Sequence, residues 1–147
     1  MAQETEIPSL HDFRHHERVQ LRFNDIDILG HLNNTVYFSL FDTGKALYMR
    51  EAGLRGDGDS RPQTVIANVN CRYVKPIHFD DRISVLTRCC HVGTKSYRLQ
   101  QLLVDDDGGV RAVCETVMVR IDSRTGLPTE VTAEERRLIS EYENRKF

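Results

Sequence analysis

The stretch from residue 21 to residue 37 brings together groups that could carry out hydrolytic chemistry. It contains two carboxylates, a histidine and two adjacent amides, at Asp25, Asp27, His31, Asn33 and Asn34. An apolar pattern typical of a helix begins directly afterwards, and the first N–H groups of a helix have no intrahelical acceptor. These groups also carry the positive end of the helix dipole, which favours anions. The spacing therefore predicts a site where acids and backbone donors meet a ligand.

The residues alone leave the role of this stretch open. A carboxylate such as Asp27 can attack a carbonyl carbon directly or activate a water molecule, while free helix N–H groups at residues 33–35 stabilise the oxygen where charge develops. An Asp or Asn before a helix more commonly caps the helix or forms a turn. Both interpretations require a strand, a turn and a helix in that order.

The flanking residues supply these elements. Alternation of apolar and polar side chains over residues 17–23 predicts a half-buried strand. Residues 34–51 carry an apolar stripe at helical spacing, which predicts a long helix lying against a sheet. Gly44 inside this helix indicates a close backbone approach, and Gly53 is expected to end it, followed by a loop at 54–62.

Four further strands are predicted at residues 64–74, 82–92, 95–104 and 110–122, joined by turns that favour an antiparallel sheet. Alternation in the first of them places Val65, Ala67, Val69, Cys71 and Tyr73 on one face, and Asn68, Asn70 and Arg72 on the other. Residues 132–144 predict a surface helix that opens with a capping box between Thr132 and Glu135. The fold class is α+β, with one curved sheet wrapped around one helix.

Length and composition limit the function classes. The 147 residues fit a single domain at 15–147, preceded by a polar, poorly ordered lead-in at 1–14. The net charge of -2, without a basic block, argues against nucleic acid as a partner. The absence of a leader segment or long apolar run predicts a soluble cytoplasmic protein that does not enter a membrane. The four cysteines are expected to be free thiols, and no histidine spacing suggests a metal site.

The motif spanning residues 24–37, Asn-Asp-Ile-Asp-Ile-Leu-Gly-His-Leu-Asn-Asn-Thr-Val-Tyr, resembles the signature of hotdog-fold acyl-CoA thioesterases of the 4-hydroxybenzoyl-CoA thioesterase type. The resemblance continues through Tyr73 and Pro76, the acidic pair at 80–81, the Gly-Thr-Lys-Ser-Tyr run at 93–97, and the segment 122–128. It covers residues 17–139 and implies a five-stranded antiparallel sheet around a central helix, with a C-terminal surface helix. It also implies a homodimer or a dimer of dimers, with active sites at the subunit interface.

The resemblance assigns roles to individual residues. It carries the catalytic carboxylate onto Asp27 and an oxyanion site onto the N–H of Asn34, with acyl-CoA as substrate and no cofactor. Asp25 is expected to be structural. His31 is a candidate catalytic residue that could orient the substrate or protonate the leaving group, although holding the loop is the favoured role. The substrate-binding positions are expected at Tyr37, Asn68, Asn70, Lys95 and Ser96.

Three alternatives stay open from the sequence. Other branches of the hotdog fold resemble a plan with the acid on the central helix, which makes Asp42 the rival carboxylate unless it forms an ion pair with Lys45. A hotdog dehydratase acting on hydroxyacyl thioesters is a second enzyme class. A non-enzymatic acyl-CoA binding protein is the third alternative.

Overall fold

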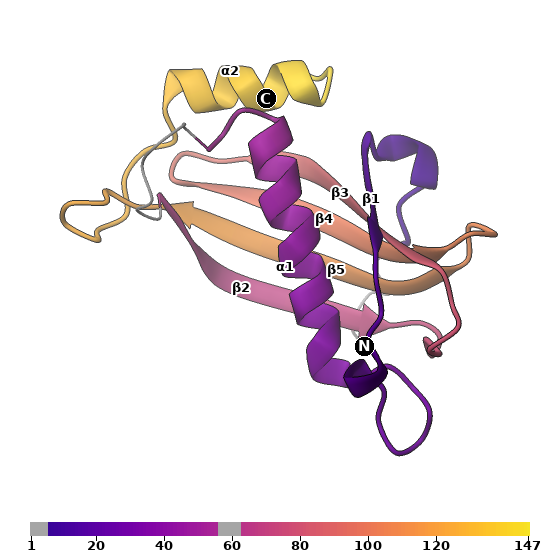
Figure 1. Cartoon of the computed structure of the whole chain (residues 1–147). Coiled ribbons are helices and arrows are strands. Elements are labelled where there is room, and N and C mark those ends of the chain that lie inside the picture. Colours follow the sequence, from indigo (N-terminus) through magenta and orange to yellow (C-terminus); the bar gives the residue numbers. More distant parts are fainter. Residues whose placement is uncertain (1–5, 56–62) are drawn as a thin grey trace.

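A five-stranded antiparallel sheet curves around one long helix in the computed structural model, which describes residues 6–55 and 63–147 (Figure 1). The helices are α1 (Asn34–Glu51) and α2 (Ala133–Tyr142), and two short 3-10 turns are η1 (Leu10–Asp12) and η2 (Phe23–Asp25). The strands are β1 (His15–Val19), β2 (Thr64–Tyr73), β3 (Ile83–Val92), β4 (Ser96–Asp105) and β5 (Val110–Arg120). The sheet order is β1-β3-β4-β5-β2. The predicted α+β class is confirmed, while most of the loop expected at 54–62 lies outside the described residues.

Helix α1 has the bounds that its sequence predicts because both ends carry strong local signals. The side chain of Asn33 accepts a hydrogen bond from the N–H of Thr35 and so caps the first turn. At the other end Gly53 adopts a φ of 78°, and the N–H of Leu54 donates to the carbonyl of Met49 at 2.9 Å. This left-handed residue after the last turn is a common helix stop.

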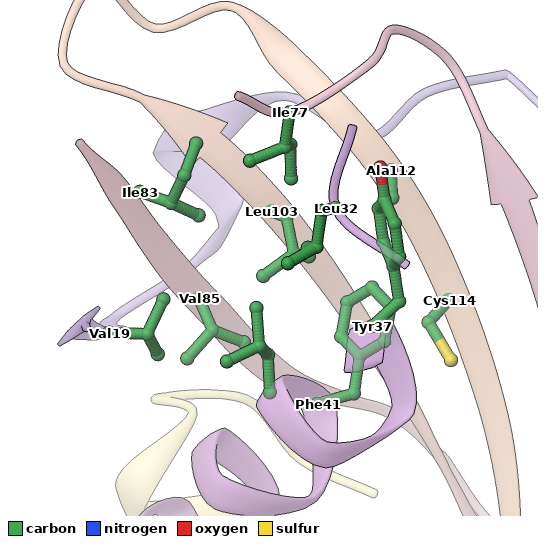
Figure 2. Close-up of a cluster of buried hydrophobic side chains, with 11 residues drawn as sticks. Val19, Leu32, Tyr37, Phe41, Ile77, Ile83, Val85, Leu103, Ala112 and Cys114 are labelled. Atoms are coloured by element: carbon green, nitrogen blue, oxygen red, sulfur yellow. The ribbon is translucent and has the colours of Figure 1, made fainter. Parts of the chain in front are cut away.

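The underside of α1 packs on the sheet through a dense apolar cluster. Tyr37 and Phe41 point from the helix toward side chains of the central strands, including Val85, Leu103 and Ala112 (Figure 2). Beyond them, the amide of Gln101 lies fully buried and donates to the carbonyl of Phe41 at 2.8 Å and to the hydroxyl of Thr87 at 2.9 Å. The first half of α1 is therefore held at a fixed height above the sheet.

Strand β2 forms an edge of the sheet and is largely exposed. It pairs only with β5, and Val65, Ile66, Val69 and Tyr73 keep between 37% and 46% of their surface exposed. A bulge leaves Ala67 without a partner on β5. Because one extra residue reverses the alternation, Ile66 faces the helix side and Val65 the outer side, so the predicted common face for Val65 and Val69 is wrong.

The N-terminal region also differs from the expectation. Strand β1 spans His15–Val19 rather than 17–23, because the chain turns at η2, where the carboxylate of Asp25 accepts from the N–H of Arg22 at 2.8 Å. Within the expected lead-in, η1 lies on the outer face of the sheet, and Phe13 packs there against Leu86 and Leu102. The part of this segment from Leu10 onward is thus packed structure.

The predicted capping box and the predicted free thiols are confirmed where the chain is described. Thr132 and Glu135 form the expected capping box of α2, and Glu135 also binds the guanidinium of Arg120 on β5 at 2.8 Å. All four cysteines are free. Neither of the two described helices is long and apolar enough to cross a membrane.

Candidate active site

The acidic loop before α1 is a small closed turn. Ile26 and Leu32 form an antiparallel bridge, and the N–H of Asp27 donates to the carbonyl of His31 at 2.8 Å. Gly30 turns the chain with a φ of 78°, a conformation that a residue with a side chain rarely adopts. Leu32 is buried in the apolar cluster under α1, so the base of the loop is anchored while its tip projects into solvent.

The carboxylate of Asp27 lies inside this turn with its two oxygens in different surroundings. Its Oδ1 atom accepts hydrogen bonds from the N–H of Leu29 at 2.9 Å and from the N–H of His31 at 3.2 Å. Its Oδ2 atom has no hydrogen-bond donor within residues 6–55 and 63–147. The turn-forming role and a chemical role are therefore compatible, because one oxygen is anchored and the other is available.

Among residues 33–36 at the start of α1, one backbone donor has no acceptor in the described chain. The N–H of Asn33 donates to the carbonyl of Asp25, that of Thr35 to the Asn33 side chain, and that of Val36 to the Asn33 carbonyl. The N–H of Asn34 has no acceptor in the part of the chain that the structure describes. The expectation of several free donors at 33–35 is corrected to a single donor at Asn34, because the Asp25 carbonyl accepts the N–H of Asn33 and the Asn33 side chain accepts that of Thr35.

The first acid of the motif belongs to the support of the loop. Asp25 keeps only 3% of its surface exposed and forms an ion pair with Arg22 at 2.9 Å. The hydrogen bond from the Arg22 side chain holds the pKa of Asp25 below its ordinary value. Its carbonyl receives the N–H of Asn33, so Asp25 links η2 to the start of α1. These contacts fit the structural role expected for Asp25.

A second histidine, which the sequence did not single out, lies beside His31. The imidazoles of His31 and His78 pack edge to face with ring centroids 5.2 Å apart. His78 precedes Asp81, whose carboxylate binds the guanidinium of Arg111 at 2.8 Å. The acidic pair at 80–81 was noted as part of a family pattern, but a contact between rings 47 positions apart leaves no local signal in the sequence.

The rival carboxylate on α1 is engaged in an ion pair. An oxygen of Asp42 lies 2.8 Å from the ammonium of Lys45, three positions along the helix. This is the ion pair expected if Asp42 is an ordinary surface acid of the helix. The side chain of Lys45 is only 8% exposed, so its charge depends on Asp42 for compensation. No such cation is bound to Asp27 among the described residues.

The substrate-binding residues expected from the sequence do not gather in one chain. Tyr37 is buried in the core, where its ring packs edge to face on Tyr73 at 4.8 Å. Asn68 and Asn70 pair with Val117 and Glu115 of β5 and so lie on the sheet face away from α1. Lys95 and Ser96 lie in the β3–β4 hairpin, at the end of the sheet opposite the start of α1 (Figure 1).

A metal centre finds no support in the described residues. They contain no group of three or more His, Cys, Asp or Glu side chains that could hold a metal ion. The loop and the helix end offer a carboxylate and a backbone N–H donor. These groups can attack a carbonyl, or activate water toward it, while the N–H group holds the carbonyl oxygen.

A family model, a relative and a solved structure each match most of this chain. The thioesterase-like superfamily model matches residues 21–138. An uncharacterized Bacillus subtilis protein, YsmA, is 24% identical over 124 residues, which cover 84% of each chain. The solved structure of a Thermus thermophilus thioesterase complexed with coenzyme A and zinc is 28% identical, with a TM-score of 0.85 over 94% of this chain and 100% of that one.

The fold also matches that of a thioesterase solved in complex with an acyl-CoA. A variant of 4-hydroxybenzoyl-CoA thioesterase complexed with 4-hydroxybenzoyl-CoA aligns with a TM-score of 0.76 over 85% of this chain and 97% of that one. At 18% identity this likeness shows the fold alone. The α+β arrangement is therefore the hotdog fold that the motif at 24–37 implied.

Proposed function

The chain belongs to the thioesterase-like superfamily, and on this basis we propose that it hydrolyses acyl-CoA thioesters to a free acid and CoA. Thioester hydrolysis in general is supported by the family and by the fold. The acyl-CoA substrate, the catalytic residues and the dimer are the parts that we propose. The observation that carries the proposal is the carboxylate of Asp27, held through one oxygen only, in the turn that leads to the free N–H group of Asn34 at the start of α1.

The two groups divide the reaction between them. The N–H of Asn34 binds the thioester oxygen as it becomes an oxyanion, assisted by the dipole of α1. Asp27 then acts through Oδ2 in one of two ways. As a nucleophile it attacks the carbonyl carbon, displaces CoA thiolate and leaves a mixed anhydride that water cleaves. As a general base it takes a proton from the water molecule that attacks the carbonyl.

The proposed assembly is a homodimer formed through β2, with pairing of two such dimers as a possible larger form. The outer edge of β2 has no partner strand in the described chain, and the strand carries exposed Ile66 and Val69. Phe38 of α1 is also exposed. A long, partly apolar edge strand is a template for pairing with a second chain. Antiparallel pairing of two β2 strands would bring the β3–β4 hairpin of one subunit to the start of α1 in the other.

This arrangement gives a role to the hairpin residues that a single chain separates from Asp27. We assign Lys95 and Ser96 to the phosphates of CoA in the site of the partner subunit, because an ammonium and a hydroxyl are suitable phosphate ligands. Tyr37, Asn68 and Asn70 have no direct substrate contact in this proposal, since Tyr37 is buried and the two amides face away from α1.

A panel of acyl-CoAs incubated with a thiol reagent tests the activity. Release of free CoA is expected from a thioesterase, whereas a dehydratase changes the acyl chain without releasing thiol and a binding protein changes neither. Asp27→Asn should lose nearly all turnover with its thermal melt unchanged. Asp42→Asn is the matched control on α1, and loss of turnover in this variant instead would transfer the catalytic role to Asp42.

Mixed dimers test whether the site is shared. Asp27→Asn and Lys95→Ala chains, co-expressed with different tags, should form dimers in which one site carries both changes and the other carries neither. Such a mixed dimer is expected to show about half the wild-type kcat with a normal KM. If the hairpin serves the site of its own chain, every site in the mixed dimer is defective and activity does not return.

A further inference from the structure

We propose that His78 is a positioning residue for the catalytic loop and acts through the ring of His31. The inference rests on the proposed role of Asp27 and adds a residue that neither the family motif nor the hydrolytic chemistry requires. It starts from the edge-to-face contact of the two imidazoles, 5.2 Å between ring centroids. This contact joins the loop before α1 to the loop that connects β2 with β3.

The loop that carries Asp27 has few other restraints. Its tip is free, since Ile28 is fully exposed and Leu29 is 74% exposed, and Gly30 adds conformational freedom. Its base is held by the backbone bridge at Leu32, whose N–H donates to the carbonyl of Ile77 at 2.7 Å. Within the loop the Asp27 carboxylate accepts the N–H groups of Leu29 and His31, and the ring of His31 packs on His78 and so ties this turn to a neighbouring segment.

His78 is itself held by a cluster of charged groups, Asp81, Arg111 and Asp105, which we call the ionic brace. Its N–H donates to Oδ2 of Asp81 at 2.7 Å, and its Nδ1 atom lies 3.6 Å from the same oxygen. Arg111 of β5 binds Asp81 at 2.8 Å and the carbonyl of Pro76 at 2.6 Å, and its Nε atom binds Asp105 at 3.0 Å. The side chain of Arg111 is only 15% exposed, so water screens these charges less than on an open surface.

The electrostatics of the brace agree with this geometry. Burial by itself would raise the pKa of Asp81, but the hydrogen bonds from the His78 N–H and from Arg111 outweigh it and lower the pKa. Asp81 therefore stays ionised and keeps both its partners. The sheet, through Arg111, sets the position of the loop at 76–81, and that loop sets the position of His78.

The brace reaches the catalytic carboxylate through His31. The N–H of His31 donates to Oδ1 of Asp27, and the carbonyl of His31 accepts the N–H of Asp27. A displacement of His31 therefore moves Asp27 relative to the N–H of Asn34, which is anchored separately by α1. Misplacement of a reacting group by about 1 Å can cost about 100-fold in rate. CoA binding does not depend on this loop in the proposed arrangement.

Three variants test the inference by steady-state kinetics on an acyl-CoA that the wild-type protein hydrolyses. His78→Ala removes the ring and should lower kcat by about 10- to 100-fold, with KM within about twofold of the wild-type value. His78→Phe restores a ring against His31 and should recover kcat to within about threefold. His11→Ala, which changes an exposed histidine of η1, is the matched control and should behave as wild type.

A readout independent of turnover is the NMR signal of the His31 ring. His78→Ala should shift the ring resonances of His31, since the neighbouring ring current is lost, and His78→Phe should keep a perturbed position. An unchanged His31 signal, or unchanged kcat in His78→Ala, would overturn the inference. Equal loss of kcat in His78→Phe and His78→Ala would also overturn it, because His78 would then act through its own nitrogens. If the wild type cleaved no thioester, the proposed function would fail, and the His31 signal would still decide whether the contact positions the loop.

Discussion

Gly44 offers a perturbation whose magnitude can be worked out from the packing under α1. A methyl group at this position would lie 2.7 Å from both Cγ1 and Cγ2 of Val85 and 3.2 Å from the Gln101 amide nitrogen. Carbon atoms normally pack about 3.5–4.0 Å apart, so Gly44→Ala forces an overlap of about 1 Å. Val85 is fully buried and β-branched, so rotation of its side chain cannot withdraw both methyls.

Two opposing terms decide the sign of the effect. Alanine favours the helix over glycine by about 1 kcal/mol, whereas overpacking a dense core costs about 1–3 kcal/mol. Because two methyls of one immobile side chain are involved, we place the cost in the upper half of that range. The free energy of unfolding should therefore fall by about 1–2 kcal/mol, which lowers Tm by roughly 2–8 °C in a chain of this size.

Urea and thermal unfolding of Gly44→Ala would measure this loss, and Val85→Ala supplies the matched background. Once the two methyls of Val85 are gone, the added methyl loses its two closest contacts, and Gly44→Ala should become neutral or stabilising by about 1 kcal/mol. The reasoning is refuted if Gly44→Ala is as stable as the wild type, or if the loss is the same in both backgrounds. In either case α1 would not be held at the height that the structure gives.

Two further predictions concern the cap and a buried histidine. Asn33→Ala removes the cap of α1 and should reduce the free energy of unfolding by about 1 kcal/mol in a urea titration, while Asn33→Asp, which keeps the acceptor for the N–H of Thr35, should not. Burial lowers the pKa of His15 against the opposing charge of Glu51, so below about pH 6.5 the unfolded chain takes up a proton that the folded chain excludes. The free energy of unfolding should therefore fall as the pH drops from 7.5 to 5.5. This fall should be smaller in His15→Phe than in the control His11→Phe, and a fall of the same size in both variants would contradict the prediction.

The local elements of the fold follow from short stretches of sequence. Helix α1 begins and ends where expected because Asn33 and Gly53 act on their own backbone within a few residues. The capping box of Thr132 and Glu135 fixes the start of α2 in the same way. Gly44 could be recognised as a close contact because glycine inside a helix is costly unless something packs against it.

The motif before α1 was identified from sequence, but the division of work inside it was not. Sequence placed a carboxylate and helix donors together, and it gave Asp25 a structural role. The structure shows that Asn33 accepts the N–H groups of Thr35 and Val36, whereas the N–H of Asn34 stays free. It also shows that one oxygen of Asp27 is anchored by hydrogen bonds. These details depend on which acceptor each N–H group meets, and residue types do not specify that.

The contacts between distant segments were decided by the tertiary structure. The bulge at Ala67 reversed the faces of β2, because alternation in sequence assumes an uninterrupted ladder and a bulge is defined only by the pairing with β5. His78 and Arg111 reach the acidic loop from elsewhere in the chain. Capping and periodicity act over a few residues and can be read in order along the chain, whereas these contacts exist only once the sheet has brought its strands and connecting loops together.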